Sequence, residues 1–259
     1  MRVRRLPRGE ETTLDEHVEE LRQRVFVAIG AIASGTVAAF LVHDRILDAL
    51  SRPLPPAHRH LVTFGVAEPF SVSLWVSFYA GLVLASPVIL WQVWSFFVPA
   101  LDPGAERRIA GFAAFGAALA AAGLGFGYDV LLPRALPWLT NFDSGNFHVL
   151  IRASDYLSFV VSVLLGVAAV FELPVVVVAA VSLGILTSSM LRRNRRVGYV
   201  IVAAVALALP GPDPVTTMLE LLPMWALFEG SIWLAFFVER ARPHALDGDR
   251  FDAVAQQPD

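Results

Sequence analysis

The 259-residue sequence contains no cysteine and no lysine, and these two absences exclude several kinds of chemistry. A chain without cysteine has no disulfides and no thiolate metal sites. All twenty basic residues are arginine, so the chain has neither a P-loop lysine for nucleotide phosphates nor a lysine for a Schiff base. We therefore expect no nucleotide hydrolysis, no metal and no cofactor, and the chain is not expected to be an enzyme.

Charge is also scarce. Only 17% of the residues are charged, 56% are hydrophobic, and the mean hydropathy is +0.61, which is too apolar for a soluble domain. A helix needs about 20 apolar residues to cross a bilayer. Six segments meet or approach this length: 25–42, 70–94, 109–128, 156–182, 198–210 and 217–238.

These segments predict an all-α polytopic membrane protein with six transmembrane helices, of which the last two are short. The fifth, "GYVIVAAVALALP", has thirteen residues, about 20 Å of helix, and the turn "GPDPVTT" joins it tightly to the sixth. Residues 1–24 are expected to form a cytoplasmic amphipathic segment. Residues 25–238 then form the membrane domain, and residues 239–259 a disordered cytoplasmic tail.

The arginines predict the orientation of the chain. Fifteen lie in the leader, the 95–108 and 183–197 loops and the tail, whereas the three loops on the opposite side contain five. By the positive-inside rule, both termini are cytoplasmic. An even number of spans agrees with this orientation, and the predicted location is the cell membrane.

Some features of the spans are interpreted as structural. Gly123 and Gly127, four residues apart, predict a close-packing face against another helix. Tryptophans near the predicted span ends fit an aromatic belt at the membrane boundary; these are Trp75, Trp91, Trp94 and Trp138.

Three carboxylates lie inside apolar spans: Glu172, two residues before Pro174, and Glu220 and Glu229 in the last span. An ionised carboxylate in hydrocarbon costs about 3 kcal/mol or more, so such a group usually faces a cavity, a partner or a proton path. The alternative is a neutral, hydrogen-bonded carboxyl group with a packing role. Nine residues at 100° each place Glu220 and Glu229 on opposite faces of one helix.

The stretch "DEHVEELRQR" at 15–24 brings four carboxylates and two arginines to the start of the first span. Taken alone, it is a solvated helix start with an i, i+4 pair between Glu20 and Arg24. Other stretches change this interpretation because they occur with it in a fixed order. They are "SRPLPP" at 51–56, "ASPVILWQVWSFFVPAL" at 85–101, "ERR" at 106–108, "SDYLSFV" at 154–160, "FELPV" at 171–175 and "PMWALFE" at 223–229.

Together these stretches resemble TatC, the multi-spanning subunit of the twin-arginine protein translocase, over about residues 14 to 240. The resemblance implies a receptor that binds the paired arginines of a folded substrate's signal peptide at the cytoplasmic face. It implies that Glu20 and Glu106 are the binding carboxylates. It also suggests that nearby arginines hold them in place: Arg22, Arg24, Arg107 and Arg108.

The resemblance also implies the partners and the energy source. These are single-span TatA- and TatB-type proteins along the last two spans, other copies of the chain, the lipid bilayer and the transmembrane proton gradient, without nucleic acid. Pro53 and Phe70 match positions of an outer, periplasmic cap. The expected polar or partner contacts within the membrane are Glu172, Asp213, Thr217, Glu220 and Glu229. Thr217 stands where the family commonly has glutamine, and Glu220 is an addition to its pattern.

Two other functional classes also place acidic or reactive groups inside membrane spans. A proton-coupled small-solute transporter also carries intramembrane glutamates, but such folds usually have two repeated halves, and no such repeat is present. An intramembrane hydrolase requires a nucleophile with a base or a metal cluster inside the spans, and all six histidines lie in predicted loops or tails.

Overall fold

The computed structural model describes residues 14–97, 106–146, 150–182, 184–209 and 214–240, of which 14–17, 96–97 and 106–109 are described by backbone alone. The helices in chain order are α1 Leu14–Leu41, α2 His43–Ser51, η1 Pro56–His58, α3 Glu68–Phe97, α4 Glu106–Phe126, η3 Gly127–Leu131, α5 Leu132–Asn141, α6 Ala153–Phe171, α7 Leu173–Ser182, α8 Ser188–Arg193, α9 Arg195–Ala208 and α10 Pro214–Arg240.

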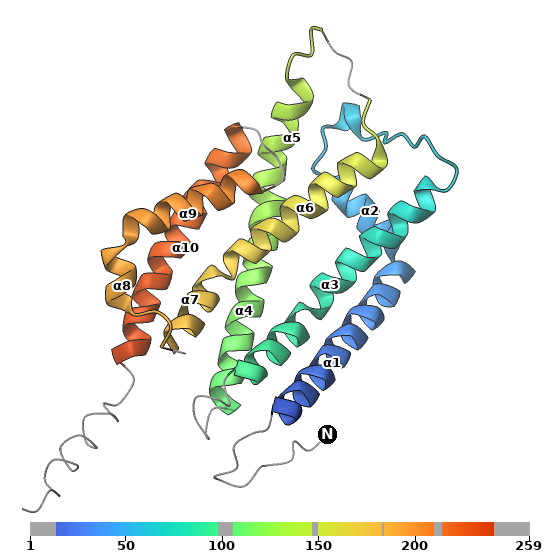
Figure 1. Ribbon diagram of the computed structural model, residues 1–259. Coiled ribbons are helices and arrows are strands. Elements are labelled where there is room, and N and C mark those ends of the chain that lie inside the picture. The colour runs from blue at the N-terminus through green and yellow to red at the C-terminus, as the bar shows by residue number, and fades with distance from the viewer. Residues whose placement is uncertain (1–13, 98–105, 147–149, 183, 210–213, 241–259) are drawn as a thin grey trace, which may run out of the picture.

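Six helical passes make up the fold. They are α1, α3, the continuous α4–η3–α5 rod, the pair α6–α7, α9 and α10, and the start of α1 and the end of α10 lie at the same end of the molecule (Figure 1). Five of the passes in the described part of the chain are long and apolar enough to cross a membrane. The sixth, α9, has 14 residues, or about 21 Å of helix.

Two predicted boundaries change. The prediction that both of the last helices are short holds for α9 but is wrong for α10, which has 27 residues and continues through Pro223. Helix α1 runs from Leu14 to Leu41 without a break, so its first turns and its membrane-crossing part are one element. Residues 1–13 and 241–259 of the predicted leader and tail lie outside the described residues.

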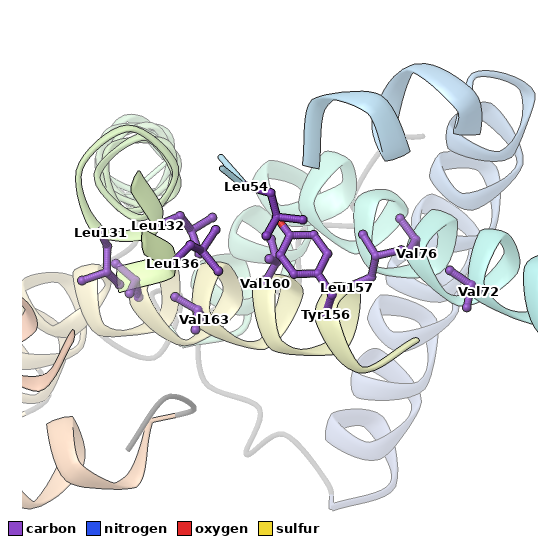
Figure 2. Packing of buried hydrophobic residues seen from close by; sticks show 11 residues of the cluster. Leu54, Val72, Val76, Leu131, Leu132, Leu136, Tyr156, Leu157, Val160 and Val163 are labelled. Atoms are coloured by element: carbon purple, nitrogen blue, oxygen red, sulfur yellow. The ribbon is translucent and has the colours of Figure 1, made fainter. Parts of the chain in front are cut away.

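The main buried cluster lies at the end of α3, α5 and α6 that is opposite the start of α1 and the end of α10. We call this end the outer end, and residues 42–67, which lie there, the outer connector. Figure 2 shows Leu54 of the outer connector above the ring of Tyr156, with side chains of α3 on one side and of α5 on the other. Its other labelled members are Val72, Val76, Leu131, Leu132, Leu136, Leu157, Val160 and Val163. This cluster joins the outer connector to three of the passes.

Small residues let two pairs of helices approach closely. A side chain at Gly81 of α3 would meet the backbone nitrogen of Thr36 in α1 at 2.4 Å. Gly123 and Gly127 of α4–η3 lie against Phe171 and Leu164 of α6, so the predicted close-packing face is confirmed.

One aromatic prediction is wrong. Trp94 does not lie in an aromatic belt but is buried, stacked on Phe112 of α4 with ring centroids 4.9 Å apart. It packs with Val175 of α7, near the end of α3. Its apolar surface is therefore used for helix packing.

Candidate functional site

The carboxylate of Glu20, near the start of α1, is held by a neighbour one turn along the helix. Its Oε1 accepts hydrogen bonds from Nε and Nη2 of Arg24, at 3.2 and 2.5 Å. The side chain of Glu20 remains 45% exposed, whereas that of Arg24 is 18% exposed. No donor among the described residues reaches Oε2, so this oxygen is open to a further cation.

Arg24 also ties α1 to the end of α3. Its Nη2 donates to the carbonyl of Ser95 at 2.9 Å, and its Nη1 donates to that of Gln92 at 3.4 Å. The last carbonyls of a helix have no partner within the helix, and a cation next to them is favourable. Arg24 therefore fixes the position of Glu20 relative to α3, as the resemblance suggested.

Arg22 pairs with a neighbouring carboxylate other than Glu20. Its Nη2 contacts Oε1 of Glu19 at 2.5 Å, one turn back and apart from Glu20. Both side chains are largely exposed, and such a pair contributes little to stability. Arg22 therefore does not contact Glu20, and a role of Arg22 in holding Glu106 stays a prediction.

Glu106 is the first residue of α4, and its side chain, like those of Arg107 and Arg108, lies outside the described residues. The start of α4 lies at the same end of the molecule as the start of α1 and the end of α3 (Figure 1). A carboxylate at a helix N-terminus is stabilised in its charged form by the helix dipole. Two acidic helix starts therefore occur at this end of the molecule.

The outer connector, residues 42–67, is bound to the helix bundle by hydrogen bonds. The hydroxyl of Tyr156 donates to the carbonyl of Leu50, and that of Tyr128 donates to the carbonyl of Ala49, both at 2.7 Å. Arg59 donates to the carbonyls of Arg52 and Leu54 within the connector. Pro53 lies in this ordered region, directly before the buried Leu54.

A bidentate ion pair joins the first residue of α3 to the residue that precedes α6. Arg152 donates through Nε and Nη2 to the two carboxylate oxygens of Glu68, at 2.8 and 3.2 Å. Oε2 of Glu68 also accepts the backbone N–H groups of Phe64 and Gly65. The backbone of Val62 pairs with Ile151 and Ala153 beside them. Glu68 and Arg152 are not predicted from the sequence as a pair, because they are 84 positions apart.

Phe70 lies in the first turn of α3, and 63% of its surface is exposed. Its ring contacts the edge of Phe40 in α1, with centroids 6.5 Å apart. The structure thus places Phe70 at the junction of α1 and α3, whereas Pro53 lies within the connector.

Glu172 follows α6 directly, at the break before α7. Both of its carboxylate oxygens are buried, and no hydrogen-bond partner reaches them among the described residues. They lie against Gly116 of α4, where a Cβ would be 3.0 Å from Oε2 and 3.3 Å from Leu90. A neutral carboxyl group is expected here, since an ionised one without a partner is costly in an apolar span.

The two glutamates of α10 face different helices, as predicted. Glu220 is 3% exposed and lines a small hollow with Phe126 of α4 and Val167 of α6. Glu229 accepts a short hydrogen bond from the hydroxyl of Tyr199 and lies 3.4 Å from Nη2 of Arg195, both on α9.

The remaining predicted contacts of α10 lie near its start. Thr217 is half-buried in the second turn, and Asp213 lies outside the described residues. The part of the chain described by the structure holds no group of three or more His, Asp or Glu side chains arranged for a metal ion.

Known proteins are similar to this chain in sequence over most of its length. Residues 16–223 match the family model described as Sec-independent protein translocase protein (TatC). The protein of that name from Carboxydothermus hydrogenoformans is 34% identical over 239 residues, with 92% of this chain and 97% of the relative covered. The one from Deinococcus radiodurans is 36% identical over 232 residues, with 86% and 85% covered.

A solved structure extends the likeness to three dimensions. The crystal structure of the twin-arginine translocase receptor TatC superposes with a TM-score of 0.73 at 29% identity, and the match covers 86% of this chain and all of the other. The helical fold and its order along the chain are thus shared. The chain belongs to the TatC family of Sec-independent protein translocase proteins.

Proposed function

We propose that this protein is the signal-peptide receptor and core subunit of a twin-arginine translocase, which exports folded proteins across the cytoplasmic membrane using the proton gradient. Family membership and the relatives named as translocase proteins support the proposal. So does the solved structure described as a receptor. The alternative, a proton-coupled solute transporter, has no support among these relatives.

The observation that carries the proposal is the arrangement around Glu20. Its carboxylate is held in place by Arg24, yet one oxygen remains open at the end of the molecule where α4 begins with Glu106. A guanidinium keeps its charge and presents a planar fork that fits a carboxylate with two hydrogen bonds, which an ammonium does not. Two such carboxylates would distinguish paired arginines from paired lysines.

The orientation and the partners belong to the same proposal. Fifteen of the twenty arginines fall in the leader, the 95–108 and 183–197 loops and the tail, so the side of the membrane that these segments share is assigned to the cytoplasm. Single-span TatA- and TatB-type helices are expected along α9 and α10, where Ile201 and Leu207 of α9 and Met218 and Leu222 of α10 are exposed. Other copies of the chain complete the assembly.

The test is direct binding of a signal peptide to the purified protein. A peptide with the Arg-Arg pair should bind at least about tenfold more tightly than its Lys-Lys variant, since hydrogen bonds to charged groups are worth about 1.5–3 kcal/mol. The affinity should fall as salt rises, because the contact lies near water. Equal affinity for the two peptides would contradict the proposal.

A further inference from the structure

Four exposed arginines lie on α8, α9 and α10, three helices that pack against one another (Figure 1). Arg192 and Arg193 end α8, Arg196 lies in the first turn of α9, and Arg240 ends α10. We refer to these four residues as the α8 arginine cluster. The Cζ atoms of Arg192 and Arg240 lie 4.3 and 4.4 Å from the centroid of one ring, that of Phe236.

The cluster has an excess of positive charge. Two acidic residues of α10 near the cluster have other partners. Glu239 accepts hydrogen bonds from the backbone nitrogen and the hydroxyl of Ser188. Glu229 contacts Arg195 and Tyr199. Within the described ranges, no carboxylate lies at ion-pair distance from any of the four arginines. Like charges held on one ring repel each other, so a bound anion would stabilise this arrangement.

The short length of α9 affects how deep in the bilayer the α8 arginine cluster lies. Its 14 residues span about 21 Å, which is less than the roughly 30 Å of a hydrocarbon core. In a bilayer that thins locally to fit α9, the arginine end of this helix would lie at the level of the lipid headgroups. Apolar side chains lie exposed beside the arginines: Met190 on α8, and Val197 and Val200 on α9. Cations next to exposed apolar side chains are the pattern of a membrane interface.

We propose that the α8 arginine cluster binds the phosphate of an anionic phospholipid in the cytoplasmic leaflet, with the acyl chains along Val197 and Val200. The inference rests on the orientation given under the proposed function. Arginine forks bind phosphate oxygens bidentately, and each basic residue near an anionic surface adds to the attraction. The lipid headgroup would lie next to the arginine end of α9, where a helix of ordinary length would continue.

The test uses the full chain, purified in detergent and mixed with equal amounts of phosphatidylglycerol and phosphatidylcholine. Native mass spectrometry then counts the lipids that remain bound. The wild type should retain phosphatidylglycerol in preference, and the variant R192Q/R193Q/R196Q should lose this preference about tenfold or more. The matched control, R45Q/R52Q/R134Q, removes three arginines from the opposite end and should keep it.

Three results would overturn the inference: no preference in the wild type, an unchanged preference in the cluster variant, or an equal loss in the control. The first would assign the cluster to another anion, such as an acidic protein segment. Melting temperatures of the three proteins verify that each is folded. Because no signal peptide is present, failure here is distinct from failure of the proposed function.

Discussion

A protein carrying both Glu20→Ala and Glu106→Ala should lose detectable binding of a twin-arginine signal peptide. Each single substitution should weaken binding about tenfold or more, since each removes a charge-assisted pair worth about 1.5–3 kcal/mol. Glu20 is half-exposed at the start of α1, so its loss should leave the melting temperature unchanged. Crosslinking of the purified variants to a labelled peptide measures the effect.

The chain offers a matched control for this experiment one position away. Glu19 is as exposed as Glu20, with 46% against 45% of the side chain accessible, but it pairs with Arg22 instead of Arg24. Glu19→Ala should therefore bind the peptide nearly as the wild type does. A double variant that binds normally, or a Glu19→Ala variant that fails equally, would refute the assignment of Glu20.

Glu172 should tolerate replacement by glutamine but not by alanine. Its carboxyl group lies buried against Gly116, and no donor reaches it among the described residues, so a neutral group that contacts a polar partner during transport is the expected form. Glutamine keeps a neutral donor of similar shape, whereas alanine removes it, and loss of one buried polar contact corresponds to about tenfold in export. Export of a folded twin-arginine substrate at matched expression measures both variants.

Equal failure of Glu172→Gln and Glu172→Ala would mean that the residue carries a proton or meets a cation, and would contradict the polar-contact role. Two glycines of α4 provide a steric test. A Cβ at Gly116 would press on Oε2 of Glu172 at 3.0 Å, whereas one at Gly111 would meet nothing within 4 Å. Gly116→Ala should reduce export and Gly111→Ala should not.

Local patterns in the sequence predicted the helices well, because apolar length and arginine asymmetry are set by the bilayer itself. The short α9 and the glycine face at Gly123 and Gly127 were also visible as local patterns. The predicted span 217–238 already contained Glu220 and Pro223, but it left out the first turn from Pro214 and the last residues to Arg240, which are less apolar. In the structure the helix includes both of these ends.

Contacts between distant positions were harder to foresee. The i, i+4 pair of Glu20 and Arg24 was visible, but the bonds from Arg24 to the carbonyls at the end of α3 were not. Glu68 and Arg152 give no local signal, since only the folded chain brings them together. Trp94 fitted a membrane belt by position, and its burial against Phe112 depends on how α3 packs on α4.

The central claim is that paired arginines of a signal peptide bind beside Glu20. The most direct measurement places a photoreactive amino acid at Gln23, an exposed position one turn along α1, and a matching probe at the exposed outer residue Thr63. An Arg-Arg signal peptide should crosslink at position 23 and not at 63, and its Lys-Lys variant should crosslink at neither. Crosslinking at 63 alone, or equal yields at position 23 from both peptides, would contradict the claim.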